Sequence, residues 1–209
     1  MKIAIFDMDG TLIDSKKDIT ISINHVREIN HALAPLSEAF IVEAINMEVR
    51  NLPKLFYDTQ IYEKRDYVLF EEHYKTQCTQ NPYLYDGIKE MLETLKREAV
   101  KLSVATNAPT QFARIMLTHL GVAELFDVII GADKVSASKP DPQMLFEILR
   151  FYSYDKDKDS AWMIGDNSKD MQSASSASIK SIFATWGFSP HATHEVVIKH
   201  PKEVLSIVL

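Results

Sequence analysis

The sequence has few of the features that mark secreted, membrane and nucleic-acid-binding proteins. It contains one cysteine, Cys78, so no internal disulfide can form, and the fold must hold in a reducing compartment or without sulfur chemistry. No apolar run approaches the roughly 18–20 residues that cross a bilayer. The N-terminal apolar run, residues 3–6, is also too short for the centre of a signal peptide. We therefore expect a cytoplasmic protein with no membrane partner.

Positive charge is also scarce relative to negative charge. There are 23 lysines and arginines against 29 aspartates and glutamates, which gives a formal net charge of −6. Binding to nucleic acid or to an anionic membrane needs a basic surface, so neither is expected as a partner. Hydrophobic residues make up 46% of the 209 residues and charged residues 25%, which is typical of a globular chain with a buried core. The length favours one domain, or one domain with a modest insertion.

Short apolar runs predict a parallel β-sheet. Five runs lack the alternation of a half-exposed strand: residues 3–6, 101–106, 128–131, 161–165 and 179–185. Continuous apolar runs are typical of strands covered by helices on both faces. Helical patterns lie between them, with Asp86 placed to cap one helix and Gly121 placed to end another. Strands that alternate with helices predict an α/β, Rossmann-like parallel-sheet core.

The connection after the first strand breaks this rhythm. Between Ser15 and Pro82 the sequence shows helical periodicity and no convincing strand. Ser37 is placed to cap one helix there, and a long helix is expected over residues 63–80. We therefore expect an inserted all-helical domain over residues 16–81. Residues 1–15 and 82–209 are expected to form the α/β core.

Polar residues follow the predicted strands at the edge where a parallel sheet holds its ligand site. In chain order they are Asp7, Asp9 and Gly10, then Thr106 and Asn107, then Lys139, and finally Asp166 and Asp170. Each one, taken singly, is explained equally well as a turn former, a helix cap or a solvated side chain. Their occurrence after successive strands favours one common site.

These residues resemble the four motifs of the haloacid dehalogenase superfamily of phosphotransferases. The first motif is the Asp-x-Asp-Gly-Thr-Leu-x-Asp-Ser stretch over residues 7–15, and the helical insertion lies where that family carries its first, C1-type cap. The Tyr-Asp-Gly at 85–87 and the Thr-Trp-Gly-Phe at 185–188 are most similar to the phosphoglycolate phosphatase branch. The resemblance implies that family's fold and a phosphatase that cleaves a small phosphate monoester. The implied partner is a small phosphorylated metabolite, and the protein is expected to be a monomer or homodimer.

The resemblance also implies catalytic roles. Asp7 is expected to attack phosphorus and form an aspartyl-phosphate. Asp9 is expected to be the general acid and base, which requires a raised carboxyl pKa. Side chains of an extended segment point to opposite faces, so a turn at Gly10 must bring Asp9 to the phosphate. Lys139 is expected to neutralise developing charge. The residues expected to hold the substrate phosphate are Gly10, Thr106, Asn107 and Lys139.

A metal ion is implied as well. A phosphate dianion beside several carboxylates is repelled unless a cation lies between them. By resemblance, Mg²⁺ would be held by the carboxylates of Asp7 and Asp166 and by the backbone carbonyl of Asp9. Asp170 would support the metal from its second coordination shell, through water.

Other functions on the same core stay open. A sugar-phosphate mutase of the β-phosphoglucomutase type, a nucleotidase and a pyrophosphatase share it. The intact set of site residues argues against a non-catalytic phosphate-binding module, and the presence of Asp9 argues against a dehalogenase. In the cap, Arg50 can be either a surface residue or a ligand for a substrate carboxylate. The spacing of His191, His194 and Glu195 fits no standard zinc pattern.

Overall fold

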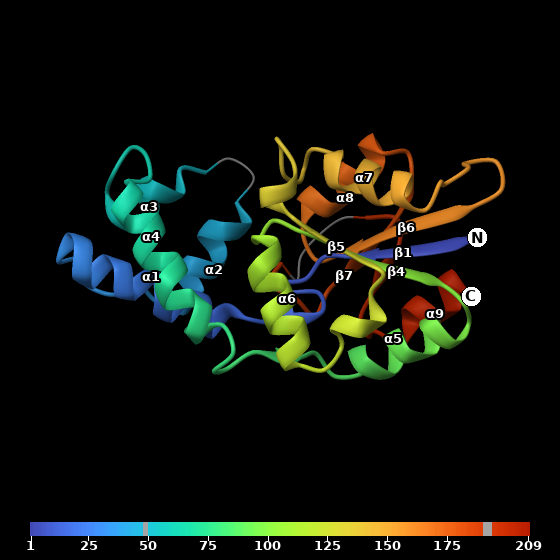
Figure 1. Cartoon of the computed structure of the whole chain (residues 1–209), viewed down its shortest axis with the longest axis horizontal. Helices are drawn as coiled ribbons and strands as arrows, with labels where there is room; N and C mark the ends of the chain where they lie inside the picture. The colour runs from blue at the N-terminus through green and yellow to red at the C-terminus, as the bar shows by residue number, and fades with distance from the viewer. Residues whose placement is uncertain (48–49, 190–193) are drawn as a thin grey trace. The chain divides into compact units, whose positions relative to one another are not determined.

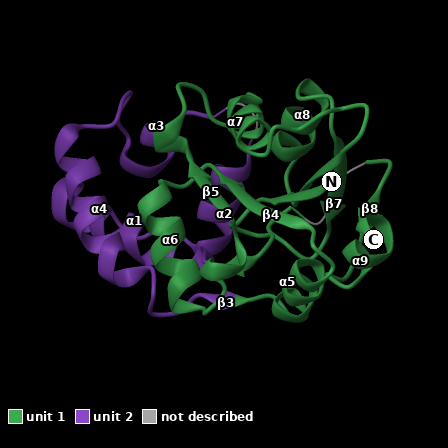
Figure 2. Cartoon of the chain, turned by 45° about the vertical axis from the view of Figure 1, so that its right-hand side comes forward, with its two compact units in different colours: residues 1–14, 84–209 green, residues 15–83 purple. Residues whose placement is uncertain are grey.

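The computed structural model describes residues 1–47, 50–189 and 194–209, and the chain divides into two compact units. One unit contains Met1–Asp14 and Leu84–Leu209, and the other contains Ser15–Tyr83 (Figure 2). The first is an α/β unit and the second is helical. In the part of the chain that the structure describes, no helix is long and apolar enough to cross a membrane.

The α/β unit is built on a six-stranded parallel sheet with the strand order β5-β4-β1-β6-β7-β8. The strands are β1 (Lys2–Phe6), β4 (Lys101–Thr106), β5 (Val128–Gly131), β6 (Ser160–Gly165), β7 (Lys180–Ala184) and β8 (Val197–Ile198). Phe6 pairs with Val104 on one side and with Ile164 on the other, so β1 is a central strand. The prediction of a parallel sheet with helices between its strands is confirmed.

Helices cover both faces of this sheet (Figure 1). On one face lie α7 (Gln143–Phe151) and α8 (Ser168–Ser176), and on the other lie α5 (Ile88–Arg97), α6 (Thr110–His119) and α9 (Glu203–Val208). The chain runs from β1 outward to β4 and β5, then crosses back to β6 and β7. Right-handed connections in these two opposite directions place the two sets of helices on opposite faces. The buried core under α7 and α8 includes Ile3, Ile5, Met144, Leu145, Ile148 and Met163.

The helix ends follow local sequence chemistry. Gly121 adopts a φ of +70° just after α6, as predicted for a left-handed stop. The expectation that Asp86 caps α5 is wrong. The cap position is held by Gly87 at a φ of +84°, a conformation that glycine adopts without strain, and a Cβ there would lie 2.9 Å from the His200 ring.

The helical unit has its own core. Its helices are α1 (Lys16–His31), α2 (Glu38–Asn46), α3 (Leu52–Tyr57) and α4 (Lys64–Gln77). Ser37 caps α2 as predicted, since its Oγ accepts a hydrogen bond from the Phe40 amide at 3.2 Å. The buried side chains of the helical unit include Ile23, Val26, Ile41, Ala44, Phe56 and Tyr57. Burial of each large hydrophobic side chain contributes about 1.5–3 kcal/mol to the packing of these helices against one another.

The chain passes between the two units through a short ladder. The strands β2 (Ile13–Asp14) and β3 (Tyr83–Leu84) form a separate two-stranded sheet at this point. Beside it, the buried carboxylate of Asp18 accepts hydrogen bonds from the Asn81 amide at 2.9 Å and from the Gln77 side chain at 2.7 Å. The segment that returns from α4 is therefore fastened to the beginning of α1.

Candidate active site

Asp7 lies directly after β1, at the carboxyl edge of the sheet. Its amide donates to the Ile164 carbonyl at 2.8 Å, so the pairing between β1 and β6 continues one residue beyond the strand. This contact fixes the main chain that carries the carboxylate. The Asp7 side chain is largely buried.

The chain turns sharply after Asp7. The Met8 carbonyl accepts hydrogen bonds from the amides of Leu12 at 2.9 Å and Ile13 at 3.0 Å, and Gly10 adopts a φ of +87°. A Cβ at Gly10 would lie 2.4 Å from Oδ2 of Asp166, so only glycine fits this close approach. The turn that the sequence required here is present, and it carries Asp9, which is half-buried.

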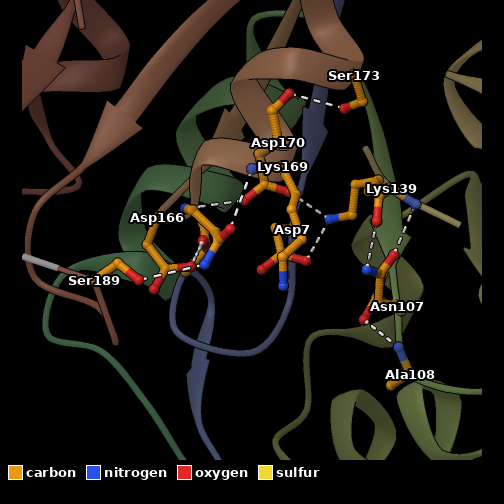
Figure 3. Close-up of polar contacts among 12 residues, drawn as sticks. Asp7, Asn107, Ala108, Lys139, Asp166, Lys169, Asp170, Ser173 and Ser189 are labelled. Carbon is orange, nitrogen blue, oxygen red and sulfur yellow. Dashed lines mark hydrogen bonds and ion pairs between the residues drawn. The ribbon is translucent and has the colours of Figure 1, made fainter. Parts of the chain in front are cut away.

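Lys139 joins two of the acidic residues (Figure 3). Its Nζ donates to Oδ1 of Asp7 and to Oδ1 of Asp170, each at 2.6 Å, and the lysine is only 4% exposed. Burial by itself lowers the pKa of the ammonium group. The negative charges of Asp170 and Asp7 outweigh this effect and hold the pKa of Lys139 above its usual value, so the lysine is a fixed positive charge.

Asp166 is held through both of its carboxylate oxygens. Oδ1 accepts from the Thr11 hydroxyl at 3.2 Å, and Oδ2 accepts from the Phe188 amide at 2.6 Å. Burial raises the pKa of Asp166 well above its usual range, and the charges of Asp7 and Asp170 raise it further.

Asp170 lies in the first turn of α8, where its Oδ2 accepts from the Asn167 amide at 3.1 Å in a capping box. Burial raises the pKa of Asp170 to about 6, with Lys139 opposing this rise and the charge of Asp7 adding to it. Both oxygens of Asp170 are therefore hydrogen-bonded: Oδ1 accepts from Lys139, and Oδ2 accepts from the amide at the start of α8.

The donor set of these aspartates fits a hard divalent cation. Asp7, Asp166 and Asp170 are buried and offer oxygen atoms that lie within 4.8 Å of one another. Divalent cations such as Mg²⁺ prefer carboxylate oxygens, and three buried carboxylates facing one lysine leave negative charge uncompensated. Across residues 1–47, 50–189 and 194–209, this is the one such cluster of acidic, histidine or cysteine side chains.

Thr106 and Asn107 lie at the end of β4, on the same edge. The Thr106 hydroxyl oxygen accepts from the Ala108 amide at 3.1 Å, which closes a small turn. The Asn107 side chain contacts the main chain of Lys139 and not the carboxylates (Figure 3). The carboxyl edge therefore carries the residues that the sequence predicts for the phosphatase site, while the phosphate contacts assigned to Gly10, Thr106 and Asn107 stay predictions.

Sequence reasoning missed the support given by the segment 185–188. The Trp186 indole N–H donates to the Thr11 carbonyl at 3.0 Å, and a Cβ at Gly187 would lie 2.0 Å from the Gly10 carbonyl oxygen. With the Phe188 amide on Asp166, this segment holds both the turn after β1 and one carboxylate. The sequence could have indicated this role, because a Trp-Gly pair directly after the last long strand falls at the same edge of the sheet.

Two other candidates from the sequence make hydrogen bonds of their own. The Arg50 guanidinium donates to the backbone carbonyls of Ile45 and Met47. The Nε2 of His194 and the Ser181 hydroxyl share a hydrogen bond of 2.9 Å, while His191 lies outside the described residues.

Comparison with known proteins agrees with this geometry. Residues 4–184 match the family described as haloacid dehalogenase-like hydrolase. A phosphoglycolate phosphatase from Aquifex aeolicus is 30% identical over 197 residues, covering 90% of this chain and 86% of the relative. An N-acetylmuramic acid 6-phosphate phosphatase from Pseudomonas aeruginosa is 28% identical over 217 residues, covering 100% of this chain and 95% of the relative.

Solved structures share the fold. A predicted phosphoglycolate phosphatase from Haemophilus somnus superposes with a TM-score of 0.85 at 24% identity, covering 100% of this chain and 98% of that one. A haloacid dehalogenase-like hydrolase from Streptococcus pneumoniae gives 0.81 at 23% identity, with 98% and 97% covered. The resemblance carried by the motifs is thus confirmed, and the chain belongs to the haloacid dehalogenase-like hydrolases, in their phosphoglycolate phosphatase-like branch.

Proposed function

We propose that this chain is a Mg²⁺-dependent phosphatase that hydrolyses a small phosphate monoester through an aspartyl-phosphate on Asp7. The observation that carries the proposal is the placement of the Asp7 carboxylate. It lies buried at the end of a central strand, 2.6 Å from a fixed ammonium group and within reach of two further carboxylates. A carboxylate held in this way is an oriented nucleophile, and the lysine stabilises negative charge that develops beside it.

The reaction takes two steps. A carboxylate oxygen of Asp7 forms a bond to phosphorus while the bond between phosphorus and the ester oxygen breaks, and Asp9 gives its proton to the leaving alkoxide. A water oxygen then attacks phosphorus, its proton passes to Asp9, and the bond to Asp7 breaks. Inorganic phosphate leaves, and both aspartates return to their starting states.

The metal complements these residues. Asp7, Asp166 and the backbone carbonyl of Asp9 would hold Mg²⁺, with Asp170 supporting it. The bound cation supplies positive charge that draws the phosphate dianion toward the carboxylates. Lys139 alone leaves that charge incomplete, because it already faces two carboxylates.

The substrate class proposed is a small phosphorylated acid. Relatives from two groups are named for phosphoglycolate and for N-acetylmuramic acid 6-phosphate. Both compounds are phosphate monoesters of organic acids, although one is a two-carbon compound and the other an amino sugar. A substrate with both a phosphate and a carboxylate is common to them.

The experiment is a release assay for inorganic phosphate with and without Mg²⁺. The panel contains phosphoglycolate, N-acetylmuramic acid 6-phosphate, β-glucose 1-phosphate, glucose 6-phosphate, a nucleoside monophosphate and pyrophosphate. We expect turnover of an acidic monoester with Mg²⁺ and none with excess chelator. Full turnover in chelator overturns the metal assignment. Conversion of β-glucose 1-phosphate to glucose 6-phosphate without phosphate release identifies a mutase instead.

A further inference from the structure

The side-chain amide of Asn107 is occupied by the main chain of Lys139. The Lys139 amide donates to Oδ1 of Asn107 at 3.0 Å, and Nδ2 of Asn107 donates to the Lys139 carbonyl at 3.0 Å (Figure 3). One amide therefore contacts both polar groups of one residue, as a neighbouring strand does in a sheet. The two hydrogen bonds use Oδ1 and one of the two N–H groups of Nδ2, and together they fix the plane of the amide against the Lys139 main chain.

The residue held in this way sits in a loop. Lys139 lies between η2, a short 3₁₀ turn at Ala132–Lys134, and α7, so no helix or strand hydrogen bonds fix its main chain. Gln143 fastens the beginning of the loop, because its Oε1 accepts from the amides of Ser136 at 2.9 Å and Ala137 at 3.2 Å. At Lys139 itself, Asn107 provides the connection from the loop to the end of β4.

The placement of the lysine ammonium depends on that main chain. Its Nζ makes two contacts of 2.6 Å, to Asp7 and Asp170, in a buried position. Short contacts to two separate carboxylates leave little room for a shift of the backbone. A displacement on the order of 1 Å in a site of this kind can lower a rate about a hundredfold.

We propose that Asn107 is a positioning residue that acts through Lys139, and that its side chain is not a ligand for the substrate phosphate. The amide of Asn107 holds the Lys139 main chain at the distance from which the ammonium reaches both carboxylates. The kinetic consequence rests on the proposed phosphatase function, whereas the placement of Lys139 does not.

The test is a double-mutant cycle with inorganic phosphate as the probe, measured calorimetrically in the presence of Mg²⁺. Asn107→Ala is made in the natural sequence and in a Lys139→Met background, which keeps the main-chain groups that Asn107 contacts. We expect Asn107→Ala to weaken phosphate binding about tenfold, the loss of roughly 1.4 kcal/mol, when Lys139 is present. In the Lys139→Met background, the same change should alter phosphate binding less than about twofold, since there is no ammonium to misplace.

If Asn107→Ala weakens phosphate binding by the same factor in both backgrounds, Asn107 contacts phosphate directly and the proposal is wrong. It is also wrong if the change has no effect on phosphate binding or kcat in the natural background. Asn107→Ser is a milder second variant. Its hydroxyl can still donate to a phosphate but cannot bridge both main-chain groups, so we expect it to behave as Asn107→Ala does.

A matched control exists in the helical unit. Asn24 makes the same pair of contacts to one residue, with Nδ2 donating to the Leu36 carbonyl at 2.9 Å and Oδ1 accepting from the Leu36 amide at 2.8 Å. Asn24→Ala removes the same two hydrogen bonds, so we expect a comparable loss of thermal stability with unchanged phosphate affinity. Equal loss of affinity in both variants would show a general effect of destabilisation and overturn the proposal.

A natural protein that neither turns over esters nor binds phosphate would contradict the proposed phosphatase function but not the role of Asn107. In that case the crystal structure of Asn107→Ala is the deciding measurement. We expect the Lys139 ammonium to lose its contact with Asp7, Asp170 or both. An ammonium that stays on both carboxylates contradicts the positioning role.

Discussion

Asp7 and Asp9 are separated by one residue but occupy different surroundings. Asp7 extends a central strand and is paired with a buried ammonium group, whereas Asp9 sits in the following turn and is half-buried. A carboxylate held in place by a neighbouring ammonium group is oriented for nucleophilic attack. A half-buried carboxyl group suits proton exchange with a leaving group or with water.

Substitution separates these two roles. Asp7→Asn replaces the attacking carboxylate with a neutral, weakly nucleophilic amide, so we expect no phosphoenzyme in rapid-quench experiments and no turnover of any ester. Asp9→Asn removes the proton donor, and kcat on an alkyl ester should fall by about 10²–10⁴-fold. An ester with an activated leaving group, such as p-nitrophenyl phosphate, needs no proton and should lose much less. Equal losses on both esters would argue against Asp9 as the acid.

At the scale of elements, the segment 185–188 connects the last long strand to the turn after the first. Gly187 packs so closely that a Cβ would lie 2.0 Å from the Gly10 carbonyl oxygen and 2.4 Å from Oδ2 of Asp166. Neither neighbour is the end of a flexible side chain that can move aside freely. The two segments, far apart in the sequence, therefore hold one fixed arrangement at the carboxyl edge.

Gly187→Ala tests this packing. The added methyl group must push the turn or the carboxylate away, so we expect kcat to fall at least about tenfold, together with weaker Mg²⁺ binding measured by calorimetry. Gly121→Ala is the control. It places alanine at a φ of +70° in open space, and should lower the melting temperature without changing kcat. If both variants lose activity in proportion to their stability, the segment has no specific effect on the site.

A pair of histidines joins α1 and α4 within the helical unit. His25 and His73 are stacked with ring centroids 4.1 Å apart, and the Ser22 hydroxyl shares a hydrogen bond of 2.9 Å with Nδ1 of His73. Burial lowers the pKa of His73, and the neighbouring His25 lowers it further. The folded unit therefore prefers an uncharged His73.

This preference makes stability depend on pH. Because the pKa of His73 is lower when folded, the unfolded chain takes up a proton first as pH drops below the ordinary histidine value of about 6.5. Stability should be full above that pH and decline as pH falls toward the lowered pKa. His73→Phe keeps a stacked ring without titration, so its melting temperature should change less between pH 7.5 and 5.5. An identical pH dependence in both proteins would exclude this pair as the cause.

At the scale of the whole molecule, the sequence predicts the long elements better than the short ones. The five buried apolar runs identified β1 and β4–β7, because strands covered on both faces leave an uninterrupted signal. The two-residue strands β2, β3 and β8 carry too few residues for any periodicity. The acidic residues were found by their place after strands, but the partners of Asn107 and Trp186 were not. Those contacts join segments separated by 32 and 175 residues, which no local pattern reveals.

The helical unit is proposed to select the substrate, while the α/β unit performs the chemistry. The ladder of β2 and β3 brings the ends of the insertion together, so a short linker can replace residues 16–81. We expect such a protein to hydrolyse a small activated ester but to lose discrimination among natural phosphate esters. Circular dichroism must first show that the shortened protein is folded. A folded protein with an unchanged specificity profile would place the selection in the α/β unit.

The strand order also sets when the site can form during synthesis. β1 is made first but takes its two neighbours from Lys101–Thr106 and Ser160–Gly165, whereas the contacts of the helical unit are complete once Tyr83 has been made. At about 5–20 residues per second, the strand that carries Asp7 waits roughly 8–30 seconds on the ribosome for its second neighbour. A chain released before that point lacks Asp166 and Asp170 and exposes an apolar strand edge that can pair with other chains. Premature termination therefore yields an aggregation-prone product with no catalytic activity.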